Sequence, residues 1–187
     1  MKIKIKLTTE MLGTVAKDQE VYKTYIESKK PAGQTEPEYL TVEKSEEKGW
    51  TGFHKDENGL FIYEYMIKGF LKAAGNALKE IVKVKNLRSK IDDFVFITPR
   101  RIYLNQQEPD GVIERPLRAI TMQGPRVTLA RSDYVKEGKE LDFEIILIPH
   151  KEVDQELIET LLEHGRLMGL GQFRNGGYGR FEVLSIE

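Results

Sequence analysis

The sequence predicts an α+β protein with a ferredoxin-like core, in which the elements follow one another as β-α-β-β-α-β. Three observations predict it: a strand pattern at the N-terminus, two segments with a helical apolar stripe, and apolar strands flanking each of them. The core elements are expected at residues 1–7, 64–84, 93–104, 140–148, 152–168 and 178–186. In this order both helices lie on one face of an antiparallel sheet and leave the other face open.

The first strand alternates lysines with apolar residues, the period-two pattern of a strand with one buried face. The lysines are Lys2, Lys4 and Lys6. Because they share one face, they form a row of ammonium groups on the open side of the sheet. Such a row can bind phosphates. The alternative is a solvated edge strand whose lysines only discourage aggregation.

The longest helix is expected at residues 64–84, where apolar residues recur with the 3.6-residue period of a helix. The predicted buried stripe is Ile67, Phe70, Leu71, Ala74, Leu78, Ile81 and Val82. Lys68 and Lys72 lie on the other side. Gly69 and Gly75 each cost the helix about 1 kcal/mol relative to alanine. Either close approach of another backbone or loose packing explains them.

Two insertions are expected in an otherwise single domain that spans residues 1–187. The first, at about 8–60, is polar and interrupted by proline and glycine. The second, at about 105–137, contains two strand-like segments, 112–122 and 126–130, joined by a Gln-Gly-Pro turn. This pattern predicts an accessory hairpin.

The C-terminal segment is rich in glycine. Five glycines lie within eleven residues, at positions 169, 171, 176, 177 and 179. Arg174, Asn175, Tyr178 and Arg180 are interleaved with them. Glycines let a backbone approach a ligand closely, while guanidinium groups and an aromatic ring suit a phosphate–sugar backbone. The alternative is a helix end followed by a turn, with solvated arginines.

Composition excludes several classes of function. The net charge of −1 gives no global basic signal, so binding to a nucleic acid requires local patches. The chain has no cysteine, which excludes disulfides and thiolate chemistry. No segment has the length and apolarity of a signal peptide or a membrane span. We therefore expect a cytoplasmic protein without a membrane partner, a metal or a cofactor.

Four segments, in order, resemble the RAMP superfamily of CRISPR-associated proteins, and most closely its backbone subunits, which coat guide RNA. They are the opening strand and loop at 2–13, the segment 56–72 with its Lys68-Gly69 pair, the charged turn and strand at 135–145, and the glycine-rich loop at 169–181. The loop is the most specific of them, because it ends in a glycine–aromatic–glycine run followed by a basic residue.

The resemblance implies a non-catalytic, RRM-like RNA-binding protein of antiviral defence. Its partners would be guide RNA and other effector subunits or copies of itself. The residues expected to contact RNA are Lys2, Lys4, Lys6, Lys68, Lys72, Arg174, Asn175, Gly176, Gly177, Tyr178 and Arg180. Contacts of this kind go to the RNA backbone and carry no sequence information.

Two other functions are compatible with the sequence. A RAMP-like chain of near-neutral charge could occupy a subunit position and inhibit or regulate a CRISPR effector, as an anti-CRISPR protein would. It could also be a metal-independent endoribonuclease, which needs a general base near the 2′-hydroxyl. The candidate for that role is His54, beside Lys55. The resemblance adds Asp18, because backbone subunits of some effectors cut target RNA with an aspartate in the loop after the first strand. The three histidines have no metal-ligand spacing.

Overall fold

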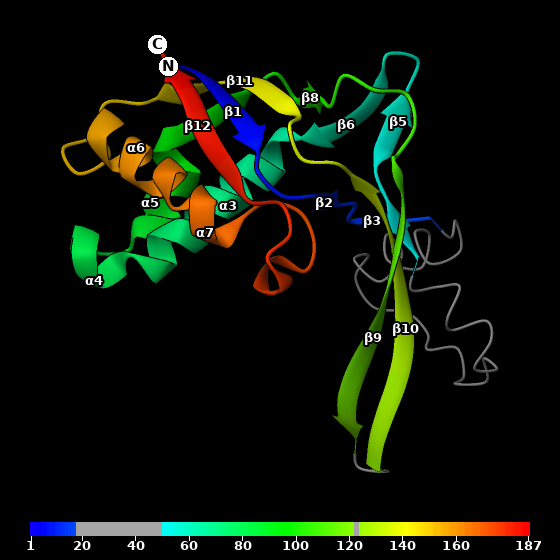
Figure 1. Ribbon diagram of the computed structural model, residues 1–187. Helices are drawn as coiled ribbons and strands as arrows, with labels where there is room; N and C mark the ends of the chain where they lie inside the picture. Colours follow the sequence, from blue (N-terminus) through cyan, green and yellow to red (C-terminus); the bar gives the residue numbers. More distant parts are fainter. Residues whose placement is uncertain (18–49, 122–123) are drawn as a thin grey trace, which may run out of the picture.

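The computed structural model describes residues 1–17, 50–121 and 124–187 of the chain (Figure 1). Its strands are β1 (Lys2–Leu7), β2 (Met11–Leu12), β3 (Val15–Ala16), β4 (Thr51–Gly52), β5 (His54–Asp56), β6 (Gly59–Tyr63), β7 (Val95–Thr98), β8 (Arg101–Tyr103), β9 (Gly111–Thr121), β10 (Gly124–Val135), β11 (Glu140–Leu147) and β12 (Phe181–Ile186). Its helices are α3 (Glu64–Ala77), α4 (Lys79–Val82), α5 (Leu87–Phe94), α6 (Gln155–Glu163), α7 (Gly165–Met168) and the 3-10 turn η1 (Arg174–Gly176). The protein is therefore α+β, as predicted.

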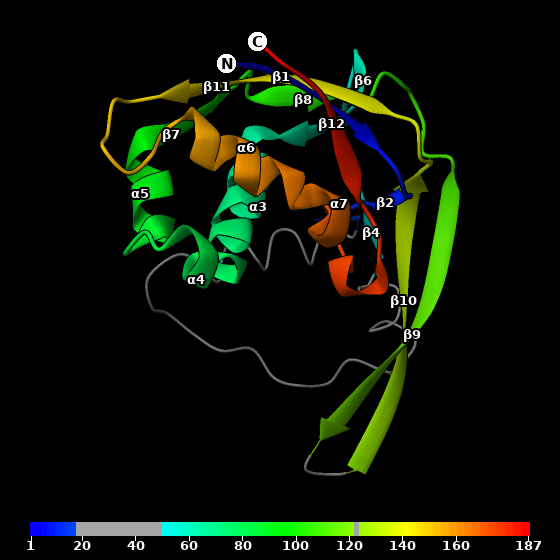
Figure 2. The ribbon, with the colours of Figure 1, turned by 60° about the vertical axis from the view of Figure 1, so that its left-hand side comes forward.

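Four strands form an antiparallel sheet in the order β12-β1-β11-β7. Helices α3, α5, α6 and α7 cover one face of this sheet (Figure 2). The apolar residues of β1 face the helices and are buried, whereas its lysines lie on the other face, which confirms the predicted alternation. The two ends of the chain meet at its edge, where Lys2 and Glu187 exchange backbone hydrogen bonds of 2.7 and 2.9 Å.

The first long helix is shorter than predicted. α3 ends at Ala77, α4 follows as a separate turn, and Lys83 closes it in the left-handed conformation. Ile67, Phe70, Leu71 and Ala74 are buried as expected, but Ile81 is 72% exposed, so the predicted stripe is wrong at that position. The helical path turns after Leu78, which carries Ile81 away from the core.

The segment 93–104, expected as one strand, is strand over most of its length but contributes to three different elements. Helix α5 occupies its beginning, and its Leu87 and Ile91 are buried against α3. β7 then joins the four-stranded sheet, and β8 joins another sheet. Pro99 separates the two strands, since it has no N–H group to continue a ladder.

The second helical segment also divides. α6 begins after Asp154, whose carboxylate accepts a hydrogen bond of 2.9 Å from the Leu157 amide. α6 ends at Glu163, and α7 begins after His164. The apolar residues of α6 (Leu157, Ile158, Leu161 and Leu162) are buried, as the sequence predicts.

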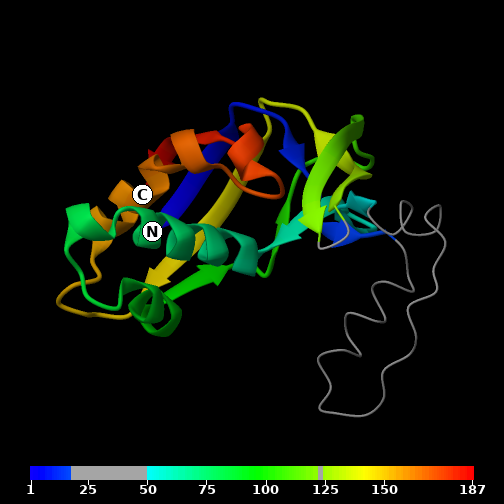
Figure 3. The same cartoon turned by 90° about the horizontal axis from the view of Figure 1, so that it is seen from below.

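Two further sheets lie beside the four-stranded one (Figure 3). Strands β5, β6 and β8 form an antiparallel sheet whose inner residues, Leu60, Ile62 and Ile102, share one hydrophobic core with β1 and the helices. In the other, β10 pairs with β2, β4 and β9. The β9–β10 hairpin, predicted at residues 112–130, runs from 111 to 135 and extends beyond the rest of the described chain (Figure 1).

Candidate nucleic-acid interface

The glycine-rich segment between α7 and β12, which we call the glycine loop (residues 169–180), is held in an unusual conformation. Gly169, Gly171, Gly177 and Gly179 all have positive φ angles, from 71° to 87°. A side chain at Gly179 would overlap the backbone carbonyl of Leu170. Glycine is therefore required here both by backbone conformation and by close packing.

The loop is anchored to the segment that follows β1. The Gly179 amide donates a hydrogen bond of 2.7 Å to the Glu10 carbonyl. The Thr9 hydroxyl accepts from the Arg180 amide at 2.9 Å and donates to the Gly177 carbonyl at 2.9 Å. Residues more than 160 positions apart in the sequence thus fix one loop. The loop is therefore an anchored structure, while the alternative that its arginines are merely solvated remains open.

A groove runs between the glycine loop and the N-terminal part of α3. Its lining consists of Thr14, Tyr65, Met66, Gly69, Phe70, Leu170, Gly171 and Arg174. Gly69 is exposed in this groove, and a methyl group at this position would meet no atom within 4 Å. Gly75 differs, because a side chain there would lie 3.0 Å from Leu87 of α5. The structure thus accounts for Gly75 by helix packing and leaves Gly69 as open backbone in the groove.

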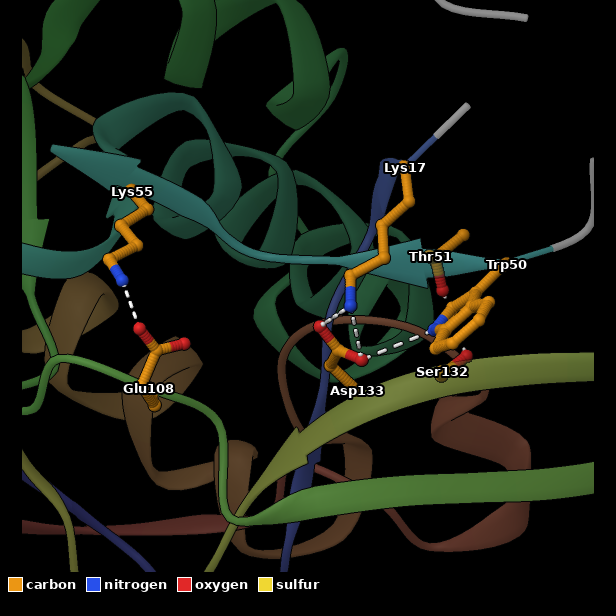
Figure 4. A network of polar contacts seen from close by, with 7 residues as sticks. All are labelled: Lys17, Trp50, Thr51, Lys55, Glu108, Ser132 and Asp133. Atoms are coloured by element: carbon orange, nitrogen blue, oxygen red, sulfur yellow. Dashed lines mark hydrogen bonds and ion pairs between the residues drawn. The ribbon is translucent and has the colours of Figure 1, made fainter. Parts of the chain in front are cut away.

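A buried polar cluster fixes the base of the β9–β10 hairpin (Figure 4). Asp133 is almost fully buried. Its carboxylate forms an ion pair of 2.6 Å with Lys17 and accepts a hydrogen bond of 3.2 Å from the Trp50 indole. Next to it on β10, the Ser132 hydroxyl lies 2.8 Å from that of Thr51. A separate ion pair, Lys55 with Glu108, lies at the other end of this region (Figure 4).

The same cluster reaches the glycine loop. The side-chain carbonyl of Gln172 accepts hydrogen bonds from Thr51 at 2.8 Å and from Ser132 at 2.9 Å. Arg115 of β9 donates to the Ser132 hydroxyl at 2.7 Å, and its guanidinium carbon lies 4.6 Å from the centre of the Phe173 ring. The base of the hairpin therefore packs against the glycine loop and helps to fix its position.

Arg115 is a buried charge that has no acidic partner among the described residues. It is 7% exposed, its Nε has no hydrogen-bond partner, and no described residue forms a salt bridge with it. Burial lowers the pKa of the Arg115 guanidinium from its usual value. A buried cation without a counter-ion creates a positive potential, and the glycine loop lies directly over it.

The predicted RNA-binding residues fall into three groups in the structure. Arg174, Asn175, Gly176, Gly177, Tyr178 and Arg180 stay together in the glycine loop. Within the described part of the chain, neither Arg174 nor Arg180 forms a salt bridge, and the Arg180 Nε is buried without a partner. Contacts of these two guanidinium groups with RNA remain a prediction.

The predicted lysines are in different surroundings. Lys68 donates to the Asp92 carbonyl at 2.9 Å, and Lys72 pairs with the Asp92 carboxylate at 2.5 Å, so both ammonium groups lie against α5. Hydrogen bonds from Lys72 lower the pKa of the Asp92 carboxyl, which is the expected effect of this pair. Contacts of Lys68 and Lys72 with RNA remain a prediction.

The lysine row of β1 lies beside an acidic row of β11. Lys2, Lys4 and Lys6 pair in register with Glu144, Asp142 and Glu140. Lys4 lies 3.4 Å from both Glu140 and Asp142, and the hydrogen bonds that it donates to Asp142 and then to Glu140 raise the pKa of its ammonium group. The open face is thus a mixed-charge surface, and phosphate binding by these lysines also remains a prediction.

Of the two candidates for RNA cleavage, the structure describes only His54. Asp18 is outside the described residues. His54 is on β5, with its ring 5.4 Å from Phe61 and 4.6 Å from Tyr63, and burial lowers the pKa of its imidazole. Among the residues described, no group of three histidine, aspartate or glutamate side chains could hold a metal ion.

Several residues of this interface have no signal in the sequence. Arg115, Gln172 and Phe173 are brought together only by the pairing of β9 with β10 and by the path of the loop. Phe173 carries a positive φ of 54°, which non-glycine residues seldom adopt. A sequence pattern identifies the arginines between the glycines, but not the buried arginine beneath them.

Comparison with known proteins gives a likeness of fold. No family model and no curated protein matches the sequence. A chain in the cryo-EM structure of the Type III-B Cmr-beta bound to cognate target RNA superposes with a TM-score of 0.53 and 14% sequence identity over 100% of this chain. The two chains share a fold. This protein spans 58% of the length of the Cmr chain.

At this level of identity the likeness is one of fold alone, and it is consistent with the α+β class that the sequence predicts. It does not assign this protein to a family or to a subunit type. In the described part of the chain, no helix has the length and apolarity needed to cross a membrane.

Proposed function

We propose that this protein is a RAMP-like RNA-binding protein that holds the backbone of a guide RNA as a subunit of a CRISPR effector, or as a solitary homologue of one. The four-stranded sheet with α3 and α6 is its ferredoxin-like core, with the predicted insertions after β1 and between the middle strands. The glycine loop and the groove beside α3 form the contact surface.

The observation that carries the proposal is the concentration of uncompensated arginines at the glycine loop. Arg174 and Arg180 have no salt-bridge partner among the described residues, and buried Arg115 lies beneath the loop. The predicted lysines Lys4, Lys68 and Lys72, in contrast, contact carboxylates. In a protein with a net charge of −1, this is a local anion site rather than a general electrostatic attraction.

The groove supports the same proposal in geometric terms. Gly69, exposed on α3, and Gly171, with a φ of 78°, both line it. Gly69 leaves open space for a sugar–phosphate chain to approach the protein backbone, whereas a side chain at Gly171 would meet the Leu12 carbonyl. Arg174 lies at the edge of this groove and can donate paired hydrogen bonds to a phosphate.

The test is a comparison of RNA affinity at several salt concentrations. Wild-type protein should bind a single-stranded oligoribonucleotide, and its affinity should fall as salt rises. The Arg174→Ala/Arg180→Ala variant should bind more weakly. Its slope of log K against log salt should be smaller by about 1.4, because two phosphate contacts are lost. Binding that does not depend on salt would contradict the proposal.

The matched control removes the same charge from a distant surface. Lys83 and Lys85 follow α4, at the end of α3 opposite the groove, and are exposed. The Lys83→Ala/Lys85→Ala variant should keep the wild-type slope. A third variant, Lys4→Ala/Lys72→Ala, tests the other predicted contacts, and we expect its slope to be close to that of the wild type.

One observation favours a second function, that of a protein-interaction module which mimics a subunit and inhibits or regulates an effector. The open face of the four-stranded sheet carries mixed charges, with Phe96 43% and Ile146 47% exposed beside them in register. Such a surface suits a protein partner better than phosphates. Pull-down of effector complexes by the wild type, but not by a Phe96→Asp variant, would support this function.

A further inference from the structure

The outer face of the β5-β6-β8 sheet carries an aromatic cluster that the glycine loop does not use. The strand register places His54, Phe61 and Tyr103 side by side, and Tyr63 opposite Arg101. These side chains share one face, while Leu60, Ile62 and Ile102 point into the core. Phe61 is the centre of the cluster, with ring distances of 5.4 Å to His54, 5.2 Å to Tyr63 and 5.8 Å to Tyr103.

The cluster continues onto α3 through Tyr65. Its ring stacks on that of Tyr63, with centres 5.5 Å apart and an angle of 25° between the planes. Tyr65 is 57% exposed, which is unusual for a large aromatic side chain held in a stack. It therefore presents a wide aromatic surface whose orientation is set by the ring beneath it.

Two arginines, Arg100 and Arg101, lie beside the rings, and they differ in whether an acidic side chain neutralises them. Arg101 binds the Asp56 carboxylate at 2.7 Å, and the Tyr103 hydroxyl donates to the same carboxylate at 2.9 Å. Arg100 is exposed, lies 5.5 Å from the centre of the Tyr63 ring, and forms no salt bridge within the described residues. The uncompensated charge of the cluster is therefore that of Arg100, next to the Tyr63–Tyr65 stack.

The cluster is continuous with the groove. Tyr65 belongs both to the ring stack and to the groove lining, which it shares with Gly69 and Arg174. An extended strand that leaves the groove past Tyr65 would reach Tyr63 and then Arg100. Alternation of an aromatic surface with a free guanidinium is the composition of sites that bind single-stranded nucleic acids.

We infer that the surface formed by Tyr63, Tyr65 and Arg100 is a second RNA subsite, which holds an unpaired nucleotide as the strand leaves the groove. One base stacks on Tyr65, and Arg100 binds the adjacent phosphate. Paired bases are already stacked on their neighbours, so the subsite selects single-stranded over duplex RNA. This inference rests on the proposed RNA-binding function, although it uses none of the glycine-loop residues.

The test measures the affinity of fluorescein-labelled oligoadenylate and of the same strand annealed to oligouridylate. Tyr65→Ala should weaken binding of the single strand about fivefold or more, and should leave the duplex unaffected. Tyr65→Phe keeps the ring and should retain wild-type affinity. Arg100→Ala should reduce the salt slope for the single strand by about 0.7, the contribution of one phosphate. Thermal unfolding of each variant establishes that it is folded.

Phe96→Ala serves as the aromatic control, because Phe96 is also exposed but lies on the other sheet. It should bind both RNAs as the wild type does. One outcome overturns the second subsite alone. In it the wild type binds RNA, Arg174→Ala/Arg180→Ala does not, and Tyr65→Ala and Arg100→Ala bind with unchanged affinity. The aromatic cluster would then be a surface for a protein partner. Failure of the wild type to bind either RNA overturns the proposed function and this inference together.

Discussion

At the scale of single residues, two glycines of α3 differ in what surrounds them. Gly69 faces open space in the groove, whereas a methyl group at Gly75 would lie 3.0 Å from Leu87 and 3.3 Å from Ile91. We expect Gly69→Ala to stabilise the protein by about 0.5–1 kcal/mol, since glycine is unfavourable inside a helix. Gly75→Ala should gain less or lose stability. Urea unfolding of both variants provides the measurement.

The same pair separates stability from function. Gly69→Ala should bind RNA more weakly although it is more stable, because its methyl group occupies the groove surface. Gly75→Ala should keep wild-type affinity. Weaker binding in both variants would indicate that the effect arises from helix packing and not from the groove.

His54 provides a residue-scale prediction about pH. Burial lowers the pKa of its imidazole in the folded state, so the unfolded chain takes up a proton at a higher pH than the folded protein does. His54 therefore lowers the stability of the folded protein as the pH falls through about 6.5, the pKa of a histidine in the unfolded chain. We expect the His54→Phe variant to lose less stability than the wild type between about pH 7 and pH 5, as measured by denaturant unfolding. Equal losses would contradict this account.

At the scale of elements, the glycine loop depends on contacts with the segment after β1. Gly179→Ala should destabilise the protein by more than Gly138→Ala does. Both residues have a positive φ, but a side chain at Gly179 overlaps Leu170, whereas one at Gly138 meets nothing within 4 Å. Positive φ alone costs a non-glycine residue about 1–2 kcal/mol, which Gly138→Ala measures. Hydrogen exchange should also be faster at the Leu170 amide of Gly179→Ala, because that amide donates to the Gly179 carbonyl.

At the scale of the whole molecule, the outer part of the β9–β10 hairpin is separate from the core. Among the hairpin residues whose side chains the structure describes, the buried ones lie near its base: Arg115, Ala130, Ser132, Asp133 and Val135. A variant that joins Leu117 to Thr128, a register pair, through an Asn-Gly turn should therefore fold. Its thermal unfolding midpoint should stay within a few degrees of the wild-type value, by circular dichroism. A large decrease would show that the outer hairpin supports the core.

The local elements that the sequence predicted best are those whose periodicity directly reflects burial. β1 alternates as expected, and the apolar residues of α6 and of the first part of α3 face the core. The predicted element boundaries were wrong where the chain changes direction without a proline, a glycine or another residue that typically ends a helix or strand. The break after Leu78 and helix α5 are examples; Leu87 and Ile91 of α5 are buried against α3, a long-range contact that local periodicity does not predict.

Local sequence patterns were sufficient to predict the α+β class, the alternation of β1, the hairpin and the arginines between the glycines, since each depends on neighbours within a few positions of the chain. They could not show which of the predicted basic residues have an acidic partner in the folded protein. Lys4, Lys68 and Lys72 meet carboxylates on β11 and α5, while Arg174 and Arg180 meet none among the described residues. Whether a charge is balanced depends on residues far away in the chain. The positions of Arg115 beneath the loop and of Tyr63 and Tyr65 beside the groove likewise depend on long-range contacts, so the sequence pattern did not reveal them.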